Sequence, residues 1–295
     1  MIRLVVLGSS ASAPSKDYFP SCFAVKYGPV LMFDCCEGAQ KQMMRYGISY
    51  SKVKAVFVTH LHADHFLGVF GLAQTMNMNG RTEPLSVFGP KGAKELFETV
   101  FSLKHLSVNF PVNVKEVSSG KIFEEELFEV RPFAVKHAGP AVGYVLEQKP
   151  YRRFDEKKAK AAGVKGRLFT DLQEKGKILI GGKTVRHEDV TYIQEGKKIV
   201  YTGDTVPCKQ IADAAENANL LVHDACFVDA DEGLAKDKKH STSSQAAEAA
   251  KKAGAKKLLL THFSNRYDDR RPLLEEAKKI FPESIMAEEG LELLI

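Results

Sequence analysis

Short apolar runs recur along this chain, and they constrain its fold more than any other feature of the sequence. Each run has the length of a buried strand and ends at turn or polar residues. Nine runs are predicted as strands: 2–8, 30–34, 54–60, 84–89, 128–137, 142–148, 197–204, 218–225 and 255–263. Four stretches have helical composition: 66–78, 89–101, 241–255 and 271–281. Because strands and helices do not alternate strictly, we predict an α/β protein with α+β-type layering, in which helices cover sheets, and not a Rossmann sheet or a barrel.

Composition places the chain among ordinary globular proteins, with 44% hydrophobic and 27% charged residues. No apolar run reaches the roughly 18–20 residues of a membrane helix, so no membrane partner is expected. The first run is typical of a strand and not of a signal peptide. The five cysteines are odd in number and lack CxxC spacing, which favours reduced thiols and a cytoplasmic protein. Glycine motifs for nucleotide phosphates are absent, so no nucleotide cofactor is expected.

Positive charge is concentrated in one segment. The chain carries a net charge of +5, but residues 149–186 hold twelve Lys or Arg and only four Asp or Glu, which leaves the rest mildly acidic. Such a segment is suited to a partner that carries phosphates, although a solvated surface loop would have the same composition. We therefore predict a single domain over residues 1–295, with residues 149–190 as a basic insert.

Histidine and aspartate close several of the apolar runs. The clearest case is Thr59–Phe66, THLHADHF, which places three histidines within six positions after a predicted strand. Polar side chains at the ends of rigid strands are how active sites are usually built. We treat His105 and His187 as surface residues. The side chains expected at one edge are His60, His62, Asp64, His65, His137, Asp204, His223, His240 and His262.

These residue types are suited to metal ions. Neutral imidazole and carboxylate groups bind Zn²⁺, Mn²⁺ or iron, and the absence of thiolate ligands argues against a closed structural zinc site. A single catalytic ion takes about three protein ligands, so this set is too large for one ion. We predict two divalent metal ions, most simply Zn²⁺, with Mn²⁺ as another option. The predicted ligands are His60, His62 and His137 for one ion, Asp64, His65 and His262 for the other, and Asp204 between them.

A pair of such ions indicates phosphodiester hydrolysis. Two ions about 3.5–4 Å apart activate a water and hold the oxygens of a phosphodiester during in-line displacement. No GxSxG motif supplies a side-chain nucleophile. The leaving oxygen needs a proton, which His240 can donate as an imidazolium if Asp224 orients it. Asp64 would also help to direct the attacking water.

Seven segments, in their order and spacing, resemble ribonuclease Z, a family of the metallo-β-lactamase superfamily. They are LGSSASAPS, FDCCEGAQKQM, THLHADHFLGVFGL, YTGDT, VHDACF, KHSTSSQAAEAAK and LLLTHFSNRY, and they extend over nearly the whole chain. The resemblance implies an αββα sandwich with a dinuclear metal site and a basic protruding arm. It also implies a homodimer in which the arm binds transfer RNA held by the other subunit.

The resemblance further implies an endoribonuclease that removes the 3′ trailer of precursor tRNA and leaves a 3′-hydroxyl on the tRNA. The residues that would touch RNA are Lys16, Ser241, Thr242, Arg152, Arg153, Lys157, Lys158, Lys165 and Arg167. The chain departs from the family in three places. The segment 14–19, PSKDYF, lacks the Arg-Asn of the family's PxKxRN loop, and the arm lacks a Gly-Pro-rich turn. Asp224 and Cys226 replace the family's Glu and Thr, so the shorter Asp224 needs a closer loop to reach His240.

Two other functions fit parts of the pattern. A hydrolase of small phosphodiesters or other esters would keep the metal ligands but would not need residues 149–186. An RNA-binding protein with a degenerate site would keep the basic segment but would bind no ion. Deletion of the basic segment should abolish cleavage by a tRNA nuclease but not turnover by a small-diester hydrolase. Metal analysis would find no bound ion in an RNA-binding protein with a degenerate site.

Overall fold

The structure, a computed structural model, describes residues 1–295 and divides into two compact units. The first unit comprises Met1–Leu146 together with Lys198–Ile295, and the second comprises Glu147–Lys197. The predicted basic insert, residues 149–190, falls within the second unit. No helix of either unit has the length and apolar character that a membrane crossing requires.

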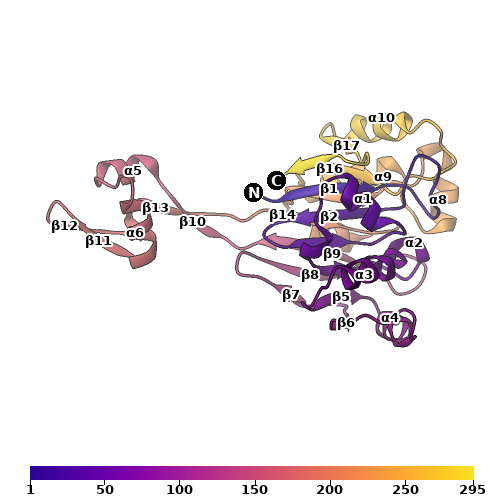
Figure 1. The fold of residues 1–295 in the computed structure, drawn as a ribbon. Helices are drawn as coiled ribbons and strands as arrows, with labels where there is room; N and C mark the ends of the chain where they lie inside the picture. Colours follow the sequence, from indigo (N-terminus) through magenta and orange to yellow (C-terminus); the bar gives the residue numbers. More distant parts are fainter. The chain divides into compact units, whose positions relative to one another are not determined.

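The first unit contains two seven-stranded sheets (Figure 1). The first sheet has the order β18-β1-β2-β3-β4-β5-β6, and the second has the order β17-β16-β15-β14-β9-β8-β7. The strands of the first are β1 (Arg3–Gly8), β2 (Cys22–Lys26), β3 (Val30–Phe33), β4 (Val53–Phe57), β5 (Leu85–Gly89), β6 (Val112–Glu116) and β18 (Glu292–Leu294). Those of the second are β7 (Phe123–Glu124), β8 (Phe128–Ala134), β9 (Val142–Gln148), β14 (Lys198–Tyr201), β15 (Leu220–Asp224), β16 (Leu258–Thr261) and β17 (Ser284–Met286).

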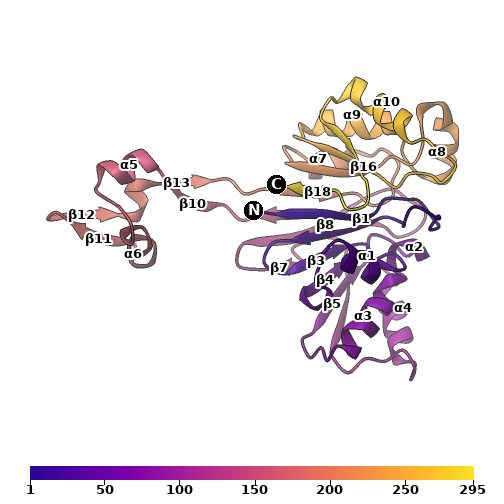
Figure 2. The same cartoon turned by 45° about the horizontal axis from the view of Figure 1, so that its top comes forward.

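The sheets pack against each other, and helices cover their outer faces (Figure 2). Alternation along β1 explains the layering, because Leu4 and Val6 enter the core between the sheets. Val5 and Leu7 point the other way, into the core beneath the first layer of helices. That layer holds α1 (Ala39–Arg45), α2 (Ala63–Phe66), α3 (Gly68–Met78) and α4 (Ala93–Ser102). The opposite layer holds α7 (Lys209–Ala214), α8 (Glu232–Lys238), α9 (Ser243–Ala253) and α10 (Arg271–Ile280). The architecture is the predicted αββα sandwich.

Most predicted elements are present. Each of the nine predicted strands overlaps an observed strand, and three of the four predicted helices correspond to α4, α9 and α10. The predicted helix 66–78 is interrupted at Leu67, which separates α2 from α3. Thr242 caps α9 through a capping box with Gln245, which explains why that helix starts where its sequence predicted.

The second unit has a small core of its own. Strands β10 (Tyr151–Phe154) and β13 (Thr191–Gln194) form one antiparallel ribbon, and β11 (Lys177–Ile180) and β12 (Lys183–Arg186) form another. Helices α5 (Glu156–Ala161) and α6 (Leu168–Lys175) complete the unit. Its buried core consists of Ala159, Val164, Leu172, Val185 and Val190. The six predicted RNA-binding cations of this unit are exposed, and none of them forms an ion pair: Arg152, Arg153, Lys157, Lys158, Lys165 and Arg167.

Candidate metal centre

The predicted ligands follow the carboxyl ends of strands in both sheets. His60 lies three residues beyond β4, Asp204 three residues beyond β14, and His262 directly after β16. His60 is fixed to the second sheet, because it pairs with Ala141 and the Thr59 carbonyl accepts a hydrogen bond from the Val142 N–H. The two sheets therefore bring residues far apart in sequence to one end of the sandwich.

The first group contains His60, His62, His137 and Asp204, whose candidate ligand atoms all lie within 4.8 Å of one another. His60 Nε2 is 2.9 Å from His62 Nδ1, which is 3.3 Å from His137 Nε2. Nitrogens that bind one tetrahedral zinc ion at 2.0–2.1 Å are separated by about 3.3 Å. The spacing of these rings therefore suits a shared ion. His137 Nδ1 bonds to the Lys239 carbonyl at 2.8 Å, which directs its Nε2 toward this group.

The second group contains Asp64, His65 and His262. Asp64 Oδ2 is 3.3 Å from His65 Nε2 and 3.6 Å from His262 Nε2. Both groups meet at Asp204. Its Oδ2 is 3.2 Å from His262 Nε2 and 3.4 Å from His65 Nε2, and it lies 3.6 Å from His60 Nε2. Asp204 therefore lies close to members of both groups.

Several polar atoms at this point are buried and have no hydrogen-bond partner: His65 Nε2, Asp204 Oδ1, His262 Nδ1 and His262 Nε2. Leaving a buried polar atom without a partner costs about 1–3 kcal/mol. Such a cluster of unpaired nitrogen and oxygen ligands is stabilised when cations bind it. The donor set therefore fits divalent metal ions, because imidazole and carboxylate are their usual ligands.

The backbone is strained where it delivers these ligands. His262 has a φ of 62°, a left-handed conformation that costs a non-glycine residue about 1–3 kcal/mol and clusters at functional sites. Gly203, with a φ of +59°, precedes Asp204, and a Cβ there would lie 2.6 Å from Thr59 Cβ. Only glycine lets the Asp204 loop approach the His60 segment this closely.

A buried carboxylate, Asp34, orients the group from behind, and the sequence analysis gave it no role. Asp34 Oδ2 accepts hydrogen bonds from His65 Nδ1 at 2.7 Å and from the Tyr201 hydroxyl at 2.6 Å. Its Oδ1 accepts the Thr59 N–H at 2.7 Å. A carboxylate on the far nitrogen of a metal-binding histidine fixes the ring and its tautomer. Asp34 closes the apolar run 30–34, just as Asp204 closes the run 197–204, so the same sequence pattern could have indicated it.

Charge and burial act differently on the two central histidines. Burial lowers the pKa of His60 well below its usual value, which keeps the imidazole in the neutral form that binds metals. Burial acts in the same direction on His65, but the carboxylates of Asp204 and Asp34 outweigh it and raise the pKa of His65. For Asp204, burial is outweighed by His262 and His65, which hold the pKa of this carboxyl well below its usual range.

His240 and Asp224 meet beside the metal ligands. His240 Nδ1 donates to Asp224 Oδ2 at 2.8 Å, and the His240 ring stacks on His262 with 5.0 Å between centroids. Asp224 is held by the N–H groups of Thr205 and Cys226, each at 3.0 Å. Burial would lower the pKa of His240, but Asp224 outweighs it and raises this pKa to about 9. The aspartate thus reaches His240 although it is one methylene shorter than the glutamate of the resembling family.

Two cavities flank His240. One, of about 350 Å³, is lined by His240, Phe227, Arg266 and the segment Ala11–Ala13. The other, of about 570 Å³, is lined by His240, Val206, Pro207 and Lys239. His240 is the one residue that lines both cavities.

Other predicted residues have different positions. Lys16 is exposed in the loop before β2. Ser241 and Thr242 are buried, with the Ser241 hydroxyl bonded to the Thr205 carbonyl and Thr242 capping α9. These two side chains hold the His240 segment in place and are not available to a substrate, which corrects their assignment. His223 belongs to neither ligand group; it is buried and its Nδ1 bonds to the Asp224 carbonyl.

Comparisons with known proteins agree on the fold and extend over the whole chain. A family model for the anti-Pycsar protein Apyc1 matches residues 2–149, and one for the beta-lactamase superfamily domain matches residues 175–263. Ribonuclease Z of Methanosarcina acetivorans is 41% identical, with 100% of this chain and 98% of the relative aligned. Ribonuclease Z of Nitrosopumilus maritimus is 40% identical, and the alignment covers both chains completely.

Solved structures give the same result. The crystal structure of human tRNase Z, short form, superimposes with a TM-score of 0.73 and 25% identity, covering 99% of each chain. The two family models each match a part of the chain, whereas the ribonuclease Z relatives match it from end to end. Their identity lies well above what a shared fold alone would require. The chain therefore belongs to the ribonuclease Z family and has the metallo-β-lactamase fold.

Proposed function

We propose that this protein is a metal-dependent endoribonuclease that removes the 3′ trailer of precursor tRNA and leaves a 3′-hydroxyl on the tRNA. The observation that carries the proposal is the junction of two His/Asp groups at Asp204, next to the hydrogen-bonded pair His240–Asp224. The whole-chain relatives that are named ribonuclease Z support it.

Two divalent ions would be held as the sequence predicted, by His60, His62 and His137, by Asp64, His65 and His262, and by Asp204 between them. We propose Zn²⁺ as the native ion, since imidazole and carboxylate ligands and the ring spacing suit it. Bound ions of this kind supply Lewis-acid stabilisation and a water that is acidic near neutral pH.

The chain's own residues provide the proton for the leaving group. Hydrolysis adds water to phosphorus and breaks the bond to the 3′ oxygen of the tRNA, which leaves the phosphate on the trailer. His240 is the candidate acid for that oxygen. Its Nδ1–H is held by Asp224, so its Nε2–H is the proton available to the substrate. Asp64, which accepts the Ser12 N–H at 3.0 Å, would help to direct the attacking water.

The second unit supplies the candidate RNA-binding surface. The six exposed cations named above have no acidic partners within the protein, so phosphates can neutralise them. We further propose a homodimer in which this unit contacts RNA held by the other subunit, in the cytoplasm, where the free cysteines stay reduced. Light scattering of the purified protein measures the oligomeric state.

Cleavage of a defined substrate tests the function directly. The purified protein with Zn²⁺ or Mn²⁺ should cut a 3′-extended tRNA transcript near the end of the acceptor stem. Mapping the ends should give a 3′-hydroxyl on the tRNA and a 5′-phosphate on the trailer. Turnover of a small diester without any cleavage of the transcript would contradict the proposal and favour the small-phosphodiester hydrolase, which the whole-chain relatives do not favour.

The second unit gives a further prediction. Replacing Arg152, Arg153, Lys157, Lys158, Lys165 and Arg167 with glutamine should raise KM for the transcript and make its dependence on salt shallower. Each lost phosphate contact reduces the slope of log affinity against log salt by about 0.9. Turnover of bis(p-nitrophenyl) phosphate should not change, because a small diester has no further phosphates for these cations to bind.

A matched control lies in the same unit. Lys175 and Arg186 are already paired with Asp171 and Glu188, so replacing these two cations with glutamine should affect KM less per residue. An unchanged salt slope in the sixfold variant would exclude this surface as the RNA contact.

A further inference from the structure

Arg270 is a buried cation without a carboxylate partner. The residue is 7% exposed, it forms no ion pair, and its Nε has no hydrogen-bond partner. Its one hydrogen bond is a long contact of 3.5 Å from Nη1 to Ser9 Oγ. Charged groups are rarely buried unless they are paired. Arg270 therefore needs another source of stabilisation.

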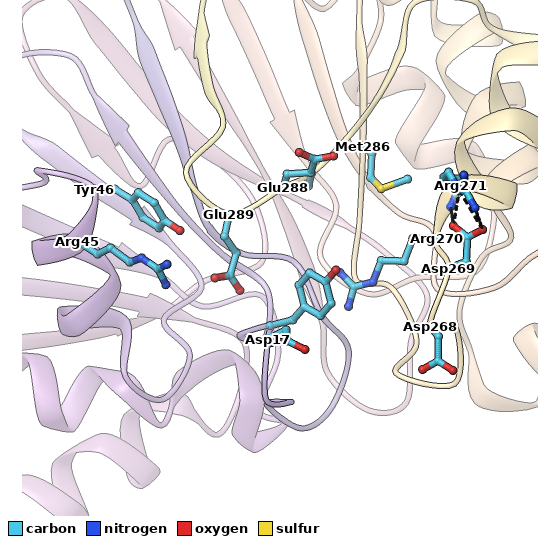
Figure 3. Close-up of a pocket in the computed structure, with 12 residues that line it drawn as sticks. Asp17, Arg45, Tyr46, Asp268, Asp269, Arg270, Arg271, Met286, Glu288 and Glu289 are labelled. Atoms are coloured by element: carbon cyan, nitrogen blue, oxygen red, sulfur yellow. Dashed lines mark hydrogen bonds and ion pairs between the residues drawn. The ribbon is translucent and has the colours of Figure 1, made fainter.

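Two of the acids near Arg270 already interact with other groups. Arg270 lines a cavity of about 510 Å³, whose lining also includes the acids Asp268, Asp269 and Glu289 (Figure 3). Asp269 forms its ion pair with Arg271 at 2.8 Å, and Glu289 accepts the Phe19 N–H and Gln42 Nε2. What contacts the guanidinium instead is aromatic. Its Cζ lies 3.7 Å from the centre of the Tyr18 ring and 5.2 Å from that of Phe263, distances at which cations attract aromatic faces.

These two rings belong to two segments that leave the candidate metal centre. Phe263 directly follows His262. Tyr18 ends a loop whose other end reaches the centre, because the Ser12 N–H donates to Asp64 Oδ2 at 3.0 Å. The Ser15 N–H donates to the Tyr18 carbonyl at 2.8 Å, and Ser15 Oγ accepts the Tyr18 N–H at 3.0 Å. Arg270 thus fixes the far end of the loop and the turn that carries Lys16.

The same loop forms a wall of the cavity beside His240. Ala11, Ser12 and Ala13 line that cavity together with His240, Phe227 and Arg266. A substrate strand that enters this cavity would therefore contact both the loop and the candidate acid. The loop is thus in contact with both the cavity and the candidate ligand Asp64.

We infer that Arg270 is a positioning residue, which clamps the ring of Tyr18 and so holds the segment Ala11–Tyr18 where it selects the phosphodiester to be cut. The inference rests on the proposed nuclease function. Neither residue touches the reacting atoms, so loss of the clamp should blur the cut position and not abolish hydrolysis. A misplacement of about 1 Å alters reaction rates by about 10²-fold, so neighbouring phosphodiesters would compete.

Four variants test the clamp. Arg270→Met removes the cation, and Tyr18→Leu removes the ring at a side chain that is 37% exposed and not part of the core. In both, the ratio of main to neighbouring cuts in a precursor tRNA should fall by about tenfold or more. Tyr18→Phe keeps the ring and should retain the wild-type ratio. Arg45→Met is the matched control, because Arg45 lines the same cavity but lies 5.6 Å from the ring of Tyr46 and not on Tyr18.

The possible outcomes are distinct. A single sharp cut in both Arg270→Met and Tyr18→Leu overturns the clamp, whether or not the rate falls, since a merely structural role lowers the rate without moving the cut. If Arg270→Met fails to fold, Tyr18→Leu alone decides. A wild-type protein that does not cut the transcript at all refutes the proposed function, which is a separate result.

Discussion

Asp204→Asn is expected to remove bound metal from both ligand groups and to lower kcat/KM for precursor tRNA by about 10³-fold or more. Asp204 Oδ2 lies within 3.6 Å of the ring nitrogens of His60, His65 and His262, so a neutral amide there weakens both groups at once. Metal ions supply several kcal/mol of stabilisation to a phosphoryl transition state, and each 1.36 kcal/mol is tenfold in rate. Metal content by mass spectrometry and cleavage kinetics measure the two effects.

Asp213→Asn is the matched control. It makes the same chemical change nine positions further on, at an exposed side chain of α7, and should leave metal content and cleavage unchanged. An Asp204→Asn protein that binds two ions per chain and cuts at the wild-type rate would exclude Asp204 as the shared ligand. Loss of one ion alone would show that Asp204 belongs to a single group.

The layered fold was predicted from the pattern of strand and helix runs, and the αββα sandwich from the family resemblance. The candidate ligands were predicted mainly from another signal, a polar residue at or just beyond the end of an apolar run. That signal works because strand ends are rigid and meet at one edge, which is where His60, Asp204 and His262 lie. The same signal selected His223, which is buried apart from the ligand groups. Neighbouring side chains on a strand point to opposite faces of the sheet. Position in the run alone therefore does not show which of His223 and Asp224 faces the site.

Other features depend on contacts between segments far apart in sequence. Asp34 orients His65 from 31 positions away, and Arg270 lies on Tyr18 from the other end of the chain. Tyr18 occupies the position of the arginine in the PxKxRN loop of the resembling family. From the sequence alone, the missing arginine was only a difference from the family pattern. Ser241 was assigned to the substrate from the family resemblance, but its hydroxyl donates to the Thr205 carbonyl. Spacing along the chain does not show which way such a side chain turns.

His240→Ala should lower the rate of precursor cleavage by about 10²–10⁴-fold, the usual contribution of a general acid. The loss should depend on the leaving group. The 3′ oxygen of a tRNA is a poor leaving group that needs a proton, whereas p-nitrophenolate leaves without one. Turnover of bis(p-nitrophenyl) phosphate should therefore fall much less than cleavage of RNA. His105→Ala, at an exposed histidine, should change neither rate.

Asp224→Asn tests the same acid through its pH dependence. Asp224 is the main cause that holds the pKa of His240 at about 9 against the opposing effect of burial. In the wild type the protonated, active form should persist until the pH approaches that value. With a neutral amide the pKa falls, so the alkaline limb of kcat/KM should move to lower pH, and activity near pH 8 should fall more than activity near pH 6. Equal loss of RNA and p-nitrophenyl ester turnover in His240→Ala, with an unmoved alkaline limb in Asp224→Asn, would show that His240 does not protonate the leaving oxygen.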